Sequence, residues 1–309
     1  GLKIALPLTF GGFLVWYSLS SISIETLATY FQNANYWWIG LGLFFGVLSH
    51  LSRAYRWKFM LEPIGYKPKL TNSVLAVLVG YLVNLAIPRA GEVSRAAVLT
   101  NYEDVPFEKG FGTIVAERIA DLVMMLLIII ITLFVQFDFI YNLLTKNFDA
   151  TKIILLALGL LIGFYLFTLY IKKATKGIAL KIKNFLSGLV EGVTSIFKMK
   201  NKWAFIFHTF FIWTMYVAMF WATIPAIEHL EVPFGGILIG FIAGGFSIAA
   251  TNGGIGLYPI AVAGALALFG IPEEPATAFG WIMWTAQTAM IIIFGGLSFL
   301  VLPIYNKNK

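Results

Sequence analysis

The residues best suited to chemistry in this sequence are charged side chains inside stretches that are apolar enough for a bilayer. Arg89, Glu92 and Arg95 lie within the apolar segment 80–99, close to Pro88. A continuous membrane helix would lose a backbone hydrogen bond at this proline and would expose the charges to lipid. The segment is therefore expected to break at the proline, and broken helices inside membranes line polar cavities or lie buried in protein.

A second charged group begins the next apolar run, and a third ends an earlier one. Glu92 and Arg95 are three residues apart on the helix that is expected to follow the break, so they are neighbours on its surface. The complete group of charged residues in these apolar stretches holds five arginines and three carboxylates. This cationic surplus predicts a site for an anion such as phosphate, which guanidinium binds through two parallel hydrogen bonds and which backbone donors at a helix N-terminus also favour. The alternative is that the charges only pair with one another to hold the break in place. The further members are Arg53, Arg56, Glu117, Arg118 and Asp121.

Another interrupted segment, 234–269, carries almost no charge. Its break contains Asn252, Gly253 and Gly254. Glycine permits left-handed backbone and close helix approach, and the asparagine amide could bind a lipid headgroup or a sugar. The alternative is that these residues serve packing alone.

Composition indicates the fold class. The chain has 309 residues, 59% of them hydrophobic and 12% charged, and the apolar residues form long runs. A transmembrane helix needs about 20 mostly apolar residues. We therefore predict an all-α polytopic membrane protein with about six full transmembrane helices and two re-entrant helical hairpins, as a single transmembrane domain. The expected spans are 6–19, 36–51, 114–135, 153–171, 203–224 and 276–302, and the expected hairpins are 70–99 and 234–269.

The order helix, helix, broken hairpin, helix occurs twice, and the distribution of lysines points the two halves in opposite directions. We predict an inverted-topology repeat with copies at 1–135 and 152–304, in which the interrupted segments meet near the membrane midplane. The lysine-rich segment 172–202 is predicted to be a cytoplasmic amphipathic helix on an anionic leaflet, or else a helix packed on the domain. The segments 21–35 and 136–150 are expected to be external loops, and both chain termini are expected in the cytoplasm.

Several function classes are disfavoured. The net charge of +7 is attributed to cytoplasmic loop lysines and not to nucleic-acid binding. The chain has no cysteine and only three widely separated histidines, of which His50 is expected to be structural. No nucleotide-binding or metalloprotease motif is present. We therefore expect no cofactor, no metal and no catalytic residue.

The sequence Pro-Arg-Ala-Gly-Glu at 88–92, together with Arg95 and the Glu-Arg-x-x-Asp of 117–121, resembles the lysylphosphatidylglycerol synthase transmembrane family, also called flippase-like proteins. The likeness covers nearly the whole chain, and the basic end of the second helix at 52–57 resembles that of the family. In the second hairpin the glycines match, but Asn252 and Pro259 stand where the family usually has Pro and Glu.

This resemblance implies lipid translocation, as in the multiple-peptide-resistance proteins, whose membrane domain moves aminoacylated phosphatidylglycerol to the outer leaflet. No segment here resembles their soluble aminoacyltransferase, so we expect that this chain does not make that lipid. We hypothesise a flippase or transporter of a phosphate-bearing phospholipid or glycolipid in the bacterial inner membrane.

In this hypothesis Arg89, Arg95 and Arg118 hold the phosphate, and the three carboxylates set arginine geometry or contact a cationic headgroup. The expected partners are the lipid substrate and anionic membrane lipids, and a second copy of the chain is an open alternative. The rival functions are an intramembrane transferase acting on a lipid-linked substrate and a non-transporting scaffold.

Overall fold

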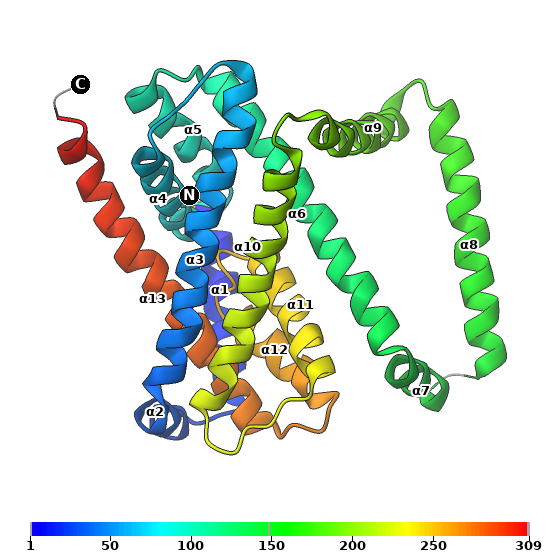
Figure 1. Cartoon of the computed structure of the whole chain (residues 1–309). Helices are drawn as coiled ribbons and strands as arrows, with labels where there is room; N and C mark the ends of the chain where they lie inside the picture. Colours follow the sequence, from blue (N-terminus) through cyan, green and yellow to red (C-terminus); the bar gives the residue numbers. More distant parts are fainter. Residues whose placement is uncertain (1, 148, 308–309) are drawn as a thin grey trace. The chain divides into compact units, whose positions relative to one another are not determined.

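The computed structural model describes residues 2–147 and 149–307, and every regular element in these ranges is a helix (Figure 1). The all-α class is thus confirmed. Long helices coincide with the six predicted spans: α1 (Leu2–Ser20), α3 (Tyr36–Leu61), α6 (Phe107–Val135), α8 (Ala150–Lys173), α10 (Lys202–Thr223) and α13 (Glu273–Tyr305).

Three of these helices are long and apolar enough to cross a membrane by themselves. They are α6, α13, and α10 with the 3-10 turn that extends it to Ala226. A fourth is added if the bent pair Leu158–Lys173 and Gly177–Asn184 forms one span. These helices support a multi-pass membrane protein, whereas the number of six spans stays a prediction. The helix α3, for example, has Arg53 and Arg56 in its second half, which makes it less apolar than a typical span.

The break expected around Pro88 is present. Helix α4 (Leu70–Ala86) ends just before it, and α5 (Ala90–Glu103) begins just after it. The two helices pack against each other as a hairpin with Gly80 opposite Gly91, where a β-carbon on Gly91 would overlap the Gly80 carbonyl and the Asn84 side chain. The Asn84 side chain accepts a hydrogen bond of 2.7 Å from the Gly91 amide and so caps α5 from the opposite arm.

The second predicted break is also present, between α11 (Phe234–Ala250) and α12 (Leu257–Ala267). Its turn depends on glycine, because Gly253 and Gly254 have φ angles of +63° and +82°. The arms pack closely, since a β-carbon on Gly244 would lie 2.6 Å from the Tyr258 ring. That either hairpin enters and leaves a bilayer on the same side stays a prediction.

The chain divides into two compact units, residues 1–125 with 200–309, and residues 126–199. In the first unit α3 lies along α10, and α13 packs against both hairpins. Gly295 of α13 lies against Leu78 and Leu82 of α4, and Gly280 of α13 lies against Pro259 of α12. Small residues thus let a single long helix contact the two broken segments.

The second unit contains α7 (Phe137–Asn147), most of α8, and α9 (Gly177–Lys198). The directions of Leu158–Lys173 and Gly177–Asn184 differ by 96°, as a surface helix following a span would require. Ile178 and Phe197 of α9 are exposed. The side chains of Phe185, Leu189 and Val193, which belong to its predicted apolar face, lie outside the described residues. The boundaries of the two repeats stay a prediction.

Two segments that we predicted as loops are helical. Helix α2 (Ile24–Asn33) is capped by Ser23, whose hydroxyl accepts a hydrogen bond of 3.0 Å from the Thr26 amide. Helix α7 likewise fills most of the segment predicted as the loop 136–150. A short helix pairs backbone groups that an irregular loop would have to leave to water, and in α2 the Ser23 cap pairs one more.

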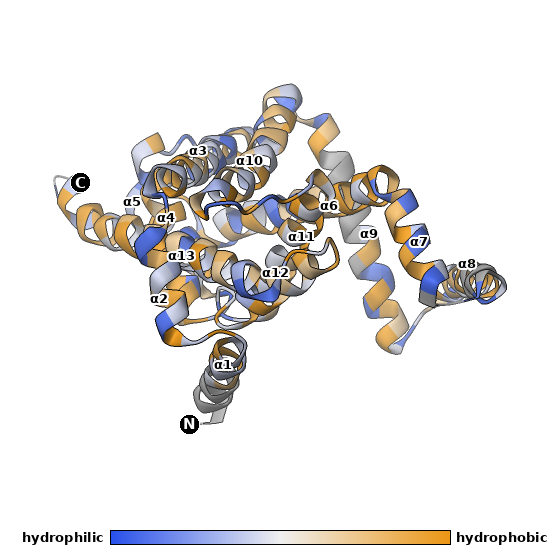
Figure 2. Ribbon diagram, turned by 90° about the horizontal axis from the view of Figure 1, so that it is seen from below, coloured by the Kyte–Doolittle hydropathy of each residue, from blue (hydrophilic) through white to orange (hydrophobic). Residues whose placement is uncertain are grey.

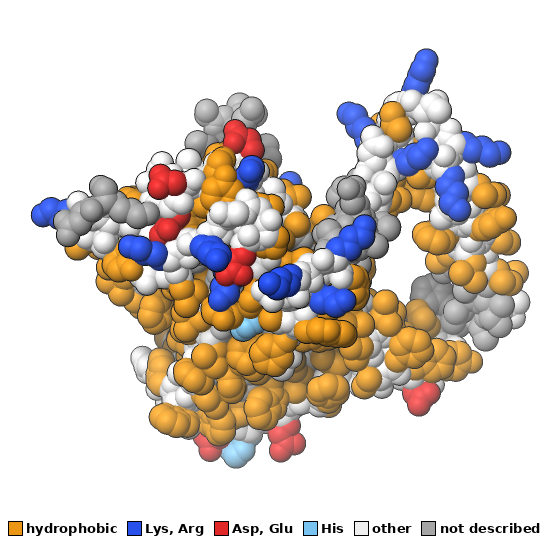
Figure 3. All heavy atoms as spheres, turned by 45° about the horizontal axis from the view of Figure 1, so that its top comes forward, with side chains coloured by type: hydrophobic (Ala, Val, Ile, Leu, Met, Phe, Trp, Pro, Cys, Tyr) orange, Lys and Arg blue, Asp and Glu red, His pale blue; other side chains and the backbone are white. Residues whose placement is uncertain are grey.

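The surface of the first unit is suited to lipid. Hydrophobic residues dominate along α6 and α13 (Figure 2), and side chains such as Phe207 and Phe299 are more than half exposed. Figure 3 shows Lys and Arg side chains gathered above a band of hydrophobic side chains, with acidic side chains and a histidine at the lower edge of this unit. An apolar band between two polar ends is the pattern of a membrane-embedded surface.

Candidate functional site

A buried carboxylate on α6, Glu117, joins helices that are distant in sequence. Its two oxygens accept hydrogen bonds of 3.0 and 3.2 Å from Arg95 of α5. One of them also accepts a 2.6 Å hydrogen bond from Arg53 of α3 and lies 3.7 Å from Arg56. Since Glu117 is fully buried, this single carboxylate neutralises charge from two other helices away from the solvent-accessible surface.

Asp121, one turn further along α6, is the second bridge. It accepts hydrogen bonds from Arg53 at 2.6 Å, from Arg118 at 3.2 Å and from Arg56 at 3.4 Å. The indole of Trp213 donates to it at 3.4 Å. We use the term ionic cluster for this group, which consists of Arg53, Arg56, Glu92, Arg95, Glu117, Arg118 and Asp121.

Helix α10 supports the ionic cluster with three polar side chains that the sequence analysis did not identify. Thr209 accepts a 2.8 Å hydrogen bond from Arg56, and Tyr216 accepts one of 3.4 Å from Arg53. Together with Trp213 they stand at positions i, i+4 and i+7, which share one helix face. That spacing within an otherwise apolar helix is the signal that could have revealed them.

Aromatic rings cover the buried guanidinium groups. The guanidinium carbon of Arg95 lies 4.4 Å from the Trp57 ring centroid, and that of Arg56 lies 5.1 Å from the ring of Phe205. The Trp57 indole is held by a 2.8 Å hydrogen bond to Thr113. Cation–π contacts and ion pairs together replace the hydration that these arginines lose.

One edge of the ionic cluster is accessible. Arg118 pairs with Glu92 of the first hairpin at 3.1 Å, and the side chains of these two residues are 39% and 21% exposed. The other three arginines are at most 3% exposed. Within the part of the chain that the structure describes, the Arg118 Nε atom and one Glu92 carboxylate oxygen have no hydrogen-bond partner. Both of these atoms are themselves buried, as are the Nε atoms of Arg53, Arg56 and Arg95, which also lack a partner among the described residues, so the accessible part of this edge consists of the other atoms of Arg118 and Glu92.

The ion pairs differ from those that sequence spacing alone would favour. Glu92 and Arg95 are i, i+3 neighbours on α5, yet each pairs with a residue of α6, namely Arg118 and Glu117. Arg118 and Asp121 do pair at that spacing. Tertiary contacts thus override the helix-surface rule where the arms of the hairpin meet α6.

Arg89 lies in the hairpin turn and not in the ionic cluster. It is exposed, and no ion pair of Arg89 occurs within the described ranges. Its φ angle of +62° is the left-handed conformation, which costs a side-chain-bearing residue about 1–2 kcal/mol relative to glycine. Strain of this kind concentrates at functional sites.

All five arginines of the chain belong to the ionic cluster or to this turn, whereas the 17 lysines lie elsewhere in the sequence. Arginine binds carboxylates and phosphates with two parallel hydrogen bonds, which lysine cannot do. The complete segregation of the two cation types is therefore a sequence signal for the site. Four arginines and three carboxylates leave the ionic cluster with one net positive charge.

The second break lies apart from the ionic cluster. Its Gly253 carbonyl accepts a 2.8 Å hydrogen bond from the Trp284 indole, and Gly253 packs against Leu85 near the end of α4. Asn252 is half-buried, and Gly254 is buried. Among the described side chains, no hydrogen bond connects Asn252, Gly253 or Gly254 with the arginines. The structure thus brings the two turns together through Leu85 and leaves the second one uncharged.

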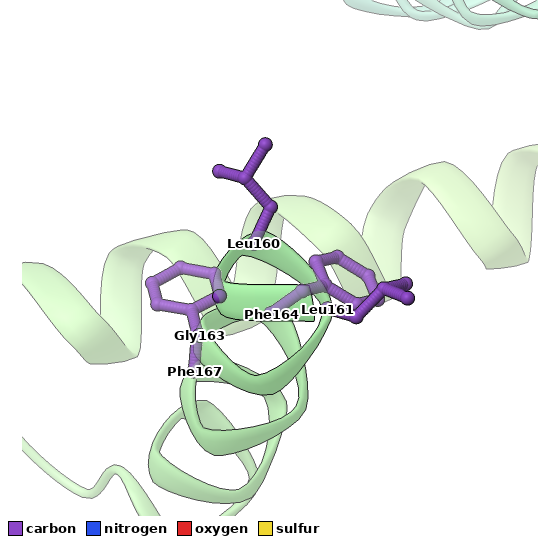
Figure 4. Close-up of a pocket in the computed structure, with 6 residues that line it drawn as sticks. Leu160, Leu161, Gly163, Phe164 and Phe167 are labelled. Atoms are coloured by element: carbon purple, nitrogen blue, oxygen red, sulfur yellow. The ribbon is translucent and has the colours of Figure 1, made fainter. Parts of the chain in front are cut away.

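Two surface hollows lie outside the ionic cluster. One lies on α8 and is lined by Leu160, Leu161, Phe164 and Phe167, which Figure 4 shows as carbon-only side chains around Gly163. It offers no group that could recognise a headgroup. The other lies between α3, α4 and α10, where a 2.8 Å hydrogen bond joins the Ser52 hydroxyl and the His208 Nδ1 atom. In residues 2–147 and 149–307 no three His, Asp or Glu side chains could hold a metal ion.

Comparison with known proteins identifies two archaeal relatives. The UPF0104 membrane protein MJ1595 of Methanocaldococcus jannaschii is 29% identical over 106 residues, which cover 33% of this chain and 32% of that protein. Glycosyltransferase AglD of Haloferax volcanii is 32% identical over 77 residues, which cover 25% of this chain and 12% of that protein. The matched parts thus span a third or less of these relatives. No solved structure matches the chain.

The family comparison covers far more of the sequence. Residues 4–295 match the profile described as the lysylphosphatidylglycerol synthase TM region. This range contains all the arginines, both hairpins and each of the candidate spans except the last residues of α13. The protein therefore belongs to the family of the lysylphosphatidylglycerol synthase transmembrane region.

Proposed function

We infer that the protein translocates a phosphate-bearing lipid across a cell membrane and binds the lipid phosphate at Arg118 and Arg89. The observation that carries this inference is the accessible edge of the ionic cluster, where the Arg118 side chain is 39% exposed and the cluster as a whole keeps one net positive charge. A phosphodiester supplies one negative charge and two acceptor oxygens, which complement that edge.

The remaining arginines have a positioning role in this proposal. Arg95 donates hydrogen bonds to both oxygens of Glu117. Arg53 and Arg56 are buried and contact side chains of α6 and α10. They hold α5 and α6 together, so that Glu92 and Arg118 face each other. Arg89 replaces Arg95 as the second phosphate ligand, because its exposed side chain is free to approach a headgroup and α5 adds the positive end of its helix dipole.

The two hairpins provide the moving parts. Each is a pair of short helices joined by a turn, and α13 packs against both. Under the inverted-repeat arrangement, one hairpin would open toward the cytoplasm and the other toward the outside. The close contact of Gly80 with Gly91 in the first hairpin, and of Gly244 with Tyr258 in the second, favours movement of each hairpin as a unit.

Transport is tested with liposomes that contain purified protein and a fluorescent NBD-phosphatidylglycerol, with dithionite added outside to bleach the accessible lipid. Wild type is expected to expose the inner-leaflet pool faster than protein-free liposomes. Arg118→Gln removes a charge-assisted hydrogen bond of about 1.5–3 kcal/mol and should slow transport at limiting lipid by roughly 10-fold or more. Lys109→Gln, an equal loss of charge elsewhere on α6, should leave transport unchanged.

Arg89→Gly separates function from folding. Glycine adopts the left-handed φ of residue 89 without strain, so this variant is expected to be as stable as wild type while losing the guanidinium. Slow transport by a fully stable Arg89→Gly variant would support the proposal. Wild-type transport no faster than that of empty liposomes, or full activity in Arg118→Gln, would refute it.

Topology is tested by single cysteines, because the native chain has none. Lys69→Cys and Asn101→Cys flank the first hairpin, and Glu231→Cys and Glu273→Cys flank the second. Re-entrant hairpins require both members of a pair to react with an impermeant maleimide from the same side, and the two pairs from opposite sides. We expect the first pair to react from the cytoplasmic side, because the segments next to it are rich in lysine.

An intramembrane glycosyl transfer is the rival function, since a relative carries the name glycosyltransferase. It would need a carboxylate that is free to act as a base. Glu117 and Asp121 are each held by at least three cationic or N–H donors, and Glu92 keeps only one unpaired oxygen. Mass spectrometry of lipid-linked sugars incubated with the protein would detect a transferred sugar if this rival were correct.

A further inference from the structure

The hollow between α3, α4 and α10 has a polar centre in an otherwise mainly apolar surface, and we call it the lateral groove. It encloses about 380 Å³, within the range of ligand pockets, which is about 300–1,000 Å³. At its centre a 2.8 Å hydrogen bond joins Ser52 and His208. Leu51, Leu70 and Phe207 line it and are exposed. The groove therefore opens on the hydrophobic outer surface of the protein.

Lys58 stands at one end of the lateral groove without an anionic partner. It follows Tyr55, a groove residue, by three positions on α3, and its Nζ atom donates a 3.3 Å hydrogen bond to the Tyr55 hydroxyl. The Nζ atom lies 4.5 Å from the ring centroid of Tyr55 and 5.6 Å from that of Phe59. In the described part of the chain Lys58 forms no ion pair, not even with Glu62 one turn further along α3. An ammonium group has three donors, so two remain for an anion.

The chemistry along the lateral groove changes in the same order as along a phospholipid. Leu48 lines the groove ten residues before Lys58, about 15 Å away along the helix axis, and Ser52 lies between them. When the His208 Nδ1 atom accepts from Ser52, the Nε2 atom carries the hydrogen, and among the described residues it has no hydrogen-bond partner. An acyl chain, an ester carbonyl and a phosphate match this sequence of apolar wall, N–H donor and ammonium group.

The end of the lateral groove at Lys58 favours a lipid of net negative charge. Lys69 directly precedes Leu70, which begins α4 and lines the groove, and Lys202 begins α10. Figure 3 shows Lys and Arg side chains gathered above the band of hydrophobic side chains. Basic residues at the headgroup level attract anionic lipids. A zwitterionic lipid would bring a second cation beside Lys58 and would fit less well.

We propose that the lateral groove binds one phospholipid of net negative charge, with its phosphate at Lys58 and its ester oxygens beside Ser52 and His208. One acyl chain lies along the apolar end of the groove. The lipid contacts the first hairpin directly, because α4 forms one wall. This site is separate from the proposed phosphate site, since Arg118 lies on α6, which does not line the groove.

The experiment is photo-crosslinking of the purified protein in liposomes. The liposomes contain a small amount of phosphatidylglycerol with a diazirine in one acyl chain, or the same diazirine lipid as phosphatidylcholine, and mass spectrometry locates the adducts. Wild type is expected to carry phosphatidylglycerol adducts in segments 48–55 and 207–211, and several-fold fewer phosphatidylcholine adducts. Lys58→Gln should reduce the phosphatidylglycerol adducts by roughly 10-fold, because a charge-assisted hydrogen bond to the phosphate is lost. Lys58→Arg should retain them.

Two further variants are controls for charge and for the ionic cluster. Lys67→Gln removes an equal charge from an exposed residue that does not line the lateral groove, and it should keep the wild-type yield. Arg118→Gln should also keep the adducts in the groove, even where it slows transport. Unfolding measurements on Lys58→Gln establish that this variant is folded before it is illuminated.

The outcomes separate the groove from the proposed transport function. Equal yields with the two lipids, unchanged yields in Lys58→Gln, or no adducts in either segment of wild type would overturn the groove site and leave the phosphate site standing. Loss of adducts in Arg118→Gln but not in Lys58→Gln would assign the lipid to the ionic cluster and also overturn it. Adducts with the expected dependence on Lys58, in a protein that does not transport lipid, would support the groove and refute the transport function alone.

Discussion

Replacing Glu117 by glutamine is the most direct test of the ionic cluster as the element that holds the first hairpin in place. The substitution preserves shape but removes the charge that Arg53, Arg56 and Arg95 share. It raises the net charge of the buried group from one positive charge to two. Breaking a buried ion pair in this way costs about 3–5 kcal/mol of folding free energy.

Glu92→Gln is the matched control, because it removes one carboxylate from the same cluster at its accessible edge. Its single ion pair with Arg118 is partly exposed to solvent and is worth at most about 1 kcal/mol. The two variants should therefore differ by about 2–4 kcal/mol, a factor of roughly 30 to 700 in the unfolding equilibrium constant. Reversible unfolding in mixed micelles with increasing dodecyl sulfate, followed by circular dichroism, measures the difference.

A double-mutant cycle identifies the partner. Arg95→Gln combined with Glu117→Gln restores the net charge of the cluster and removes both ends of the two-bond pair. The double variant should be less destabilised than the sum of the single variants by about 1–3 kcal/mol. Equal costs for Glu117→Gln and Glu92→Gln, or strict additivity in the cycle, would refute the view that a buried, shared carboxylate fixes the hairpin.

Three further predictions concern the helix packing. Gly91→Ala forces the arms of the first hairpin apart and should cost about 1–3 kcal/mol in the same unfolding assay, whereas Gly264→Ala, which has free space around it, should not destabilise. Trp284→Phe removes the hydrogen bond to the Gly253 carbonyl; it should cost about 1 kcal/mol and speed amide hydrogen exchange at residues 253–256, and unchanged exchange would contradict a role for this bond. Asn72→Leu removes the reciprocal amide pair with Asn306, so trypsin should cleave after Lys307 faster than in wild type, and equal rates would show that the pair does not restrain the C-terminal end of α13.

Features that depend on local backbone physics were predictable from the sequence. Pro88 removes an amide donor, and the glycines after Thr251 adopt left-handed φ angles, so both breaks appear where their residue types require them. The apolar runs likewise became the long helices. Long apolar runs do not predict α2 and α7, because short amphipathic helices do not contain such a run.

The partners of the charged residues were not predictable, because spacing rules apply only within one helix. The sequence alone determined that five arginines and three carboxylates lie within or beside long apolar segments, because this is a property of their positions along the chain. Only the packing of α3, α5, α6 and α10 decided that Glu117 and Asp121 bury three of the arginines and that Arg118 and Arg89 stay accessible. The physical reason is that a buried charge is stabilised by whichever opposite charge the tertiary structure places within about 3 Å, regardless of its distance along the chain.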